Sequence, residues 1–121
     1  MHWTKLECTG EDFPRPRSQH VAVADADKKK IFVFGGYAND ETCLNDSWFF
    51  EVKNNVWKRV SEGKVIEESK ESPIDVPAPR ANAGHTLYKN KVYIYGGYST
   101  PGHAPGSFQD IWSFDLETQQ W

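Results

Sequence analysis

Histidine and cysteine are the residue types in this sequence whose side chains most readily do chemistry. His20 and His85 stand at matching places in two similar stretches of chain. A residue that recurs in this way more naturally serves the repeated unit than a single reaction centre. Cys8 and Cys43 lie far apart, with no further cysteine or histidine at the spacing of zinc ligands. We therefore expect two free thiols, with neither a disulfide framework nor a structural zinc site.

The short motifs that mark common catalytic sites are also missing from the sequence. It contains no Gly-x-Ser-x-Gly nucleophile turn, no pair of metal-binding histidines and no glycine-rich phosphate loop. The sequence thus predicts a protein that is not an enzyme and that carries no cofactor and no metal.

Composition predicts one folded domain. The chain has 121 residues, of which 38% are hydrophobic and 14% aromatic, enough to pack a core. The net charge is −3 and both signs are spread along the chain, so the sequence contains no basic patch of the kind that binds nucleic acid. No segment approaches the roughly 18 apolar residues of a membrane span, and the first residues lack the core of a signal peptide. We expect a cytoplasmic protein that binds neither nucleic acid nor membrane.

An internal repeat organises most of the chain, and it must position every residue considered so far. Two stretches of nearly equal length carry the same landmarks in the same order. The matching segments are 16–20 with 79–85, 31–37 with 92–98, 46–52 with 110–116, and Trp57 with Trp121. Residues 3–6 resemble residues 57–60, which indicates the closing strand of a further repeat.

Each repeat contains short runs rich in β-branched and aromatic residues, bounded by Gly, Asn, Asp and Pro, as is typical of strands. We expect strands at 20–24 and 85–88, at the runs ending in Gly35-Gly36 and Gly96-Gly97, and at 46–52 and 110–116. Alternation along residues 46–52 indicates that one face of that strand is buried more deeply. Residues 54–55 and 89–90 suit tight hairpin turns, because Asn tolerates positive φ.

These landmarks resemble the kelch repeat of galactose oxidase/kelch-like β-propellers: a Gly-Gly pair, a following aromatic, an Asp-x-Trp and a closing Trp. The resemblance implies an all-β fold, a fragment of a kelch-type β-propeller with two four-stranded antiparallel blades. It implies that the glycine pairs free the backbone where a strand ends and that the tryptophans pack between blades. On this interpretation residues 3–6 are a closing strand of a further or permuted blade. Residues 14–60 are the first repeat, 61–79 a linker with an insertion, and 80–121 the second repeat.

Two blades alone do not close a propeller ring. Repeat proteins also generally need about three units or more for stability. Two explanations remain. The chain is the N-terminal piece of a longer propeller, or copies of it assemble into a ring in which the closing strand of one completes the last blade of the next.

The longer connections indicate where a ligand would bind. In an antiparallel meander, the loops 37–45 and 98–109 and the linker 61–79 all lie at one end of the strands. Binding residues concentrate on loops held by a rigid scaffold. We therefore expect a protein partner at this end, bound by aromatic and arginine side chains, which are common interface anchors. The candidates are Arg17, Tyr37, Arg80, Tyr98, His103 and Phe108. For the arginines and tyrosines the alternative is a structural role, in which each arginine braces the entrance of its blade.

The resemblance also leaves enzymes as an alternative. Copper radical oxidases share a kelch-like propeller, but their crosslinked Tyr and Cys with His ligands do not map onto this sequence. Specifier proteins of glucosinolate breakdown place iron on a kelch propeller, and their Glu and Asp pattern is not recognisable here. The function we expect is thus an adaptor or protein-protein interaction module.

Overall fold

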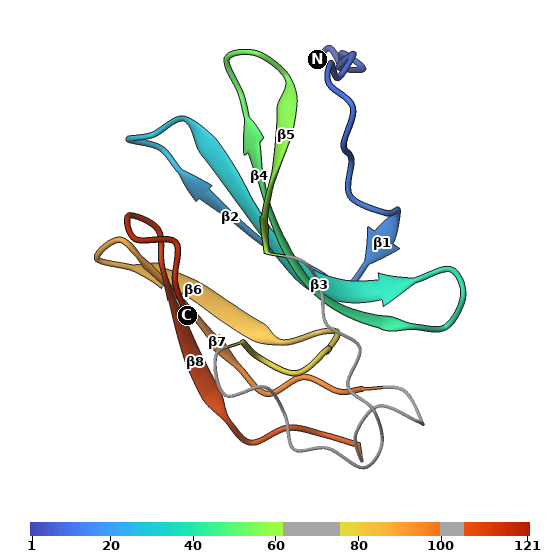
Figure 1. Cartoon of the computed structure of the whole chain (residues 1–121), viewed down its shortest axis with the longest axis vertical. Coiled ribbons are helices and arrows are strands. Elements are labelled where there is room, and N and C mark those ends of the chain that lie inside the picture. Colours follow the sequence, from blue (N-terminus) through green and yellow to red (C-terminus); the bar gives the residue numbers. More distant parts are fainter. Residues whose placement is uncertain (62–75, 100–105) are drawn as a thin grey trace.

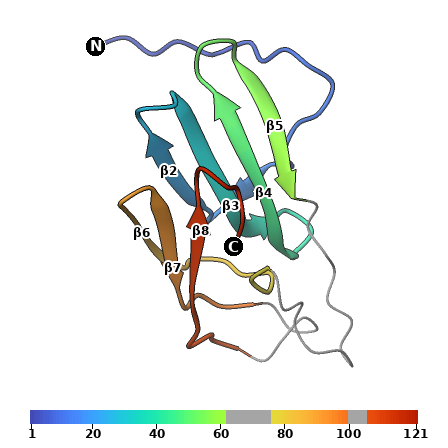
Figure 2. The same cartoon turned by 60° about the vertical axis from the view of Figure 1, so that its left-hand side comes forward.

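Eight β-strands in two antiparallel sheets make up the computed structural model, which describes residues 1–61, 76–99 and 106–121. Blade 1 consists of β1 (Arg17–Ser18), β2 (Val21–Asp25), β3 (Lys30–Ala38), β4 (Cys43–Glu51) and β5 (Val56–Ser61), and blade 2 of β6 (Gly84–Tyr88), β7 (Lys91–Tyr95) and β8 (Ile111–Asp115). The two sheets stack beside each other (Figure 1, Figure 2). The all-β fold with two repeated blades is as predicted, and none of the described residues forms a helix that is long and apolar enough to cross a membrane.

Tight turns join the strands at one end of both blades. Asn55 in the β4–β5 turn has a φ of 55°, and Lys89 and Asn90 between β6 and β7 have φ of 45° and 66°. Asparagine tolerates this left-handed conformation better than most residues do. The hairpin turns predicted at 54–55 and 89–90 are therefore confirmed.

The glycine pairs allow the chain to pass very close to the strand entrance. Gly36 has a φ of 106°, and a Cβ built on it would lie 2.7 Å from the carbonyl oxygen of Ser18. Gly97 has a φ of 91°, and its Cβ would lie 2.8 Å from the carbonyl oxygen of Ala81. Only glycine fits both the conformation and the space at these two positions.

The main core lies between the blades rather than within either one. Phe32 of β3 is fully buried and stacks on Phe114 of β8, with ring centroids 4.5 Å apart. Trp121 packs against Phe34 at a centroid distance of 4.8 Å, so this closing tryptophan does pack between blades as the resemblance implied. Aromatic pairs of this geometry add to the stabilisation that burial alone provides.

Residues 46–52 do not follow the expected burial pattern. Trp48, Phe49 and Phe50 are all buried, although they point alternately to opposite faces of β4. Phe49 faces blade 2, whereas Trp48 and Phe50 lie under Trp57 and the Arg59 guanidinium. The prediction that one face is buried more deeply is wrong here, because neighbouring elements cover both faces.

Residues 3–6 form no strand in the structure, and their expected role as the closing strand of a further or permuted blade stays a prediction. Trp3 is 92% exposed, and the first ladder contact of the chain is the parallel bridge between Thr9 and Val56. A strand needs a neighbour that accepts its backbone hydrogen bonds, and residues 3–6 have none beside them. The described residues of blade 2 form three strands, and Asp115 also makes an isolated antiparallel bridge with Gln120.

Candidate functional site

The β3–β4 loop and the described ends of the β5–β6 and β7–β8 connections lie at one end of the blades, opposite the tight turns (Figure 1). This placement follows from the antiparallel pairing of β3 with β4 and of β7 with β8. We call this region the long-loop end and define it as the described residues 13–19, 37–43, 76–83, 97–99 and 106–110. Five of the six candidate residues lie there. His103 and most of the linker lie outside the described residues.

Arg17 enters the interior of blade 1 instead of facing solvent. Its side chain is 4% exposed and makes a bidentate pair with Asp46, with N–O distances of 2.7 and 2.8 Å. It also donates to the carbonyl oxygen of Gly35 at 3.0 Å. The same carboxylate accepts a hydrogen bond from Trp48 Nε1 at 2.8 Å. The arginine, the aspartate and the tryptophan thus connect the blade entrance, the glycine pair and strand β4.

Arg80 makes the same set of contacts in blade 2. Its side chain is 1% exposed and pairs with Asp110 at 2.6 and 2.9 Å, and Asp110 accepts from Trp112 Nε1 at 2.7 Å. It donates to the carbonyl oxygen of Gly96 at 3.1 Å. The Arg80 guanidinium lies 4.0 Å from the ring centroid of Phe108. These contacts match the structural role that the sequence left open for the arginines, a brace at the entrance of each blade.

The two aspartates of these braces are held in the charged form. Burial by itself raises the pKa of Asp46, but hydrogen bonds from Arg17 and Trp48 outweigh it and lower the pKa below its usual value. The hydrogen bond from Arg80 is the main cause that lowers the pKa of Asp110, with burial opposing it. Both carboxylates are therefore ionised at neutral pH and serve the blades as acceptors.

Tyr37 and Tyr98 occupy equivalent positions after the two glycine pairs, and both are partly exposed. The Tyr98 hydroxyl donates to Gln19 Oε1 at 2.6 Å, which crosses from blade 2 to blade 1. The Cys43 thiol donates to the Tyr98 carbonyl oxygen at 3.8 Å. Partial removal from water and the nearby Glu41 carboxylate raise the pKa of Tyr37, so its phenol stays protonated and can donate.

Sequence reasoning missed Gln19 and Asn82, two amides that help to join the blades at this end. Both residues have positive φ, 56° and 58°, and the Asn82 N–H donates to the Gln19 carbonyl oxygen at 2.8 Å. The sequence did contain a signal for these two residues, because an amide residue stands two positions after Pro-Arg in both repeats. It also missed the aspartates of the two braces, although Asp-x-Trp recurs in each repeat.

The histidines and cysteines form no reaction centre within the described residues. Partial burial, then the charges of Arg17 and His85, lower the pKa of His20, which favours its neutral form. Both cysteines are free thiols, with Cys43 buried. No cluster of three or more potential metal ligands occurs in the part of the chain that the structure describes.

Comparison with known proteins agrees with the repeated blades. The family model of the KLHDC2/KLHL20/DRC7 Kelch-repeats domain matches residues 1–121. Relatives include Tip elongation aberrant protein 3 of Schizosaccharomyces pombe, 31% identical over 96% of this chain, and Dynein regulatory complex subunit 7 of Chlamydomonas reinhardtii, 30% identical over 84%. The chain spans only 11% and 8% of the lengths of these two relatives. Kelch-repeat proteins are generally protein-interaction modules. With a match over its whole length, the chain belongs to the kelch-repeat family.

Proposed function

We propose that this chain is a protein-interaction module that presents its long-loop end to a protein partner. The observation that carries the proposal is the pair Tyr37 and Tyr98, two partly exposed phenols at equivalent positions of adjacent blades. Tyrosine is favoured at interfaces because it offers a large rigid surface and a hydroxyl at low entropic cost. A cytoplasmic location suits the two free thiols.

The scaffold beneath these tyrosines supports recognition by a preformed surface. The two buried arginine braces fix the strand entrances next to the glycine pairs, and the hydrogen bond from Tyr98 to Gln19 joins the blades. A surface held in place before binding loses less conformational entropy when the partner docks. Arg17 and Arg80 act in this proposal as supports of the surface, whereas the tyrosines contact the partner.

Phe108 belongs to the same proposed surface. Its ring lies against the Arg80 guanidinium and its backbone N–H donates to the Gly97 carbonyl oxygen at 3.0 Å, so the ring is held at the edge of blade 2. Phe108 is half-buried, which leaves part of it accessible to a partner. The enzymatic alternatives considered from the sequence gain no specific support from the described residues.

The proposal is tested by substitutions that remove the phenols without disturbing the core. We expect Tyr37→Ala and Tyr98→Ala each to weaken the partner captured by the parent chain about tenfold, the effect of losing roughly 1.4 kcal/mol. Affinity capture from lysate identifies the partner, and titration against the purified partner gives Kd.

The matched control is Leu87→Ala, which removes a 42% exposed apolar side chain near the opposite end of blade 2. It should bind the partner as the parent chain does. Unchanged Kd for both tyrosine variants, each confirmed to be folded, would show that the long-loop end is not the binding surface.

A further inference from the structure

One polar contact between the two blades, at the long-loop end, decides which hydrogen bonds Tyr98 can still make. The Tyr98 hydroxyl of blade 2 donates to Gln19 Oε1 of blade 1 at 2.6 Å. A phenol carries one proton, so this bond uses its only donor and leaves the lone pairs of the phenol oxygen as acceptors. Tyr98 can therefore accept a hydrogen bond from a partner, but it has no proton left to donate.

The Gln19 amide supplies a donor beside that oxygen. Its Oε1 is occupied by Tyr98, whereas its Nε2 carries two N–H groups, and no described residue accepts from them. Because Nε2 and Oε1 belong to the same amide, these N–H groups lie next to the phenol oxygen. The Gln19 side chain is exposed and Tyr98 is partly exposed. The two residues thus offer one acceptor and one donor side by side at the surface.

Backbone hydrogen bonds hold both members of this pair in place before a partner binds. Gln19 has a φ of 56°, and its carbonyl oxygen accepts from the Asn82 N–H at 2.8 Å. Tyr98 exchanges two backbone hydrogen bonds with Ala81, at 2.9 and 3.0 Å. The left-handed conformation of Gln19 costs free energy, and such strained residues cluster at binding sites. The acceptor and the donor are therefore preorganised.

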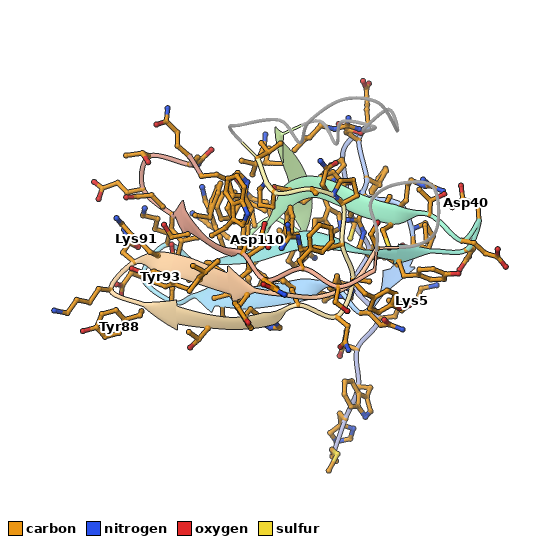
Figure 3. The ribbon with its side chains drawn as sticks, turned by 90° about the horizontal axis from the view of Figure 1, so that it is seen from below. Lys5, Asp40, Tyr88, Lys91, Tyr93 and Asp110 are labelled. Atoms are coloured by element: carbon orange, nitrogen blue, oxygen red, sulfur yellow. The ribbon has the colours of Figure 1, made fainter. Side chains whose placement is uncertain are left out.

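The surroundings of the pair favour a neutral ligand group. The guanidinium groups of both arginine braces are already paired with aspartates. Partial burial is the main cause that lowers the pKa of His20, the residue after Gln19, which favours its neutral form. Asp40 lies at the tip of the β3–β4 loop and Lys91 at the other end of the strands, near the β6–β7 turn (Figure 3). A charged group at the pair would therefore find no opposite charge on the braces or on His20.

We propose that Tyr98 and Gln19 together bind a neutral amide of the protein partner, a proposal that rests on the proposed function of the long-loop end. The amide N–H donates to the Tyr98 oxygen, and the amide carbonyl oxygen accepts from Gln19 Nε2. A side-chain carboxamide carries such a donor and acceptor side by side, and so does one residue of an extended main chain. A carboxylate has no proton for Tyr98 and an ammonium has no lone pair for Gln19, so each would leave one group unpaired.

Tyr37 offers the opposite hydrogen-bonding character, although it occupies the equivalent position in blade 1. Its phenol stays protonated, and no described residue accepts its proton, so it can donate to a partner. The partner therefore supplies a donor at Tyr98 and an acceptor at Tyr37. This difference between the two blades gives the docked partner a defined direction across the long-loop end.

The test removes the donor and the acceptor one at a time and measures Kd for the purified partner protein that the parent chain captures. Gln19→Glu keeps the length of the side chain and can still accept from Tyr98, but its carboxylate cannot donate. Tyr98→Phe keeps the ring and removes the acceptor. We expect each variant to bind about fivefold more weakly, the effect of losing one hydrogen bond to the partner.

Asn82→Asp is the matched control, because Asn82 is the equivalent amide in blade 2 and the substitution adds the same charge. The Asn82 side chain is exposed, and no described tyrosine donates to it. This variant should bind the partner as the parent chain does. An equal loss of affinity for Gln19→Glu and Asn82→Asp would show that added charge alone weakens binding, and it would overturn the proposal.

The source of the amide is found on the partner. Each Asn and Gln in the partner segment that crosslinks to a photoreactive residue at position 98 is replaced by alanine. If one replacement removes the difference in Kd between the parent chain and Gln19→Glu, a side chain supplies the amide. If none does so and the difference persists, the main chain supplies it.

The same measurements separate this inference from the proposed function. If Tyr98→Ala weakens binding but Gln19→Glu or Tyr98→Phe leaves Kd unchanged, the long-loop end binds the partner without the amide contact and the inference is wrong. If Tyr37→Ala and Tyr98→Ala both leave Kd unchanged, the proposed function fails and the inference fails with it.

Discussion

The two blades of this chain are built from the same repeat, but their side chains have different surroundings. Phe34 of blade 1 is 1% exposed, whereas Tyr95 at the equivalent place in blade 2 is 57% exposed. The carboxylate of the brace follows the same trend, with the Asp46 side chain 14% exposed and that of Asp110 41% exposed. The repeat sets the path of the backbone and the hydrogen bonds, and the neighbouring blade sets how deeply each side chain is buried.

The largest difference between the blades should appear when equivalent aromatics are truncated. Phe32→Ala removes a fully buried ring from the stack with Phe114 and should cost about 3 to 5 kcal/mol of unfolding free energy. Tyr93→Ala, at the matching position of blade 2, should cost less than half as much in this chain, because no described strand packs on its face. Urea unfolding of both variants measures the difference, and equal costs would refute the idea that the main core lies between blades.

A smaller difference should separate the two arginine braces. Arg17→Met leaves the buried Asp46 carboxylate without its partner, which should cost about 3 kcal/mol. Arg80→Met leaves the more hydrated Asp110 and should cost less. The exposed pair of Arg15 and Asp40 provides the control, since Arg15→Met should change stability by less than about 1 kcal/mol. If Arg17→Met behaved like this control, the brace would not stabilise the blade.

The prediction from the sequence succeeded where the repeat itself carries the information. Gly36 and Gly97, the hairpin turn at Asn55 and the strands before and after them follow from local spacing and backbone preference. Burial of Phe49 could not be predicted in this way, because the side chains that cover it belong to the other blade.

The candidate site was also predictable only where local sequence decides the structure. The long-loop end follows from strand direction alone, and Tyr37 and Tyr98 were found by their place after the glycine pairs. The inward turn of Arg17 could not be read from its spacing, because a partner 29 residues away, Asp46, decides it. The role of the tyrosines in binding and that of His103 stay predictions.

The smallest expected effect is a dependence of stability on acidic pH. Hydrogen bonds lower the pKa of Asp46 and Asp110 in the folded chain below the ordinary value of 3.8. The stabilisation is therefore fully present above the unfolded pKa and is lost as pH falls through the lower folded pKa. The melting temperature, measured from neutral to acidic pH, should therefore decrease once the pH is below the ordinary aspartate pKa of 3.8.

Asp46→Asn should flatten this acidic fall more than Asp110→Asn, because Asp46 is the less exposed of the two carboxylates. Equal or absent changes in the two pH profiles would contradict the assigned roles of the carboxylates in their braces.

The most direct test of the proposed protein-binding surface is site-specific photocrosslinking in cell lysate. A photoreactive phenylalanine analogue replaces Tyr37, Tyr98 or, as the control at the tight-turn end, the exposed Asn54. Positions 37 and 98 should crosslink to the same partner protein, and position 54 should not. Crosslinking to that partner at position 54, with none at 37 and 98, would contradict binding at the long-loop end.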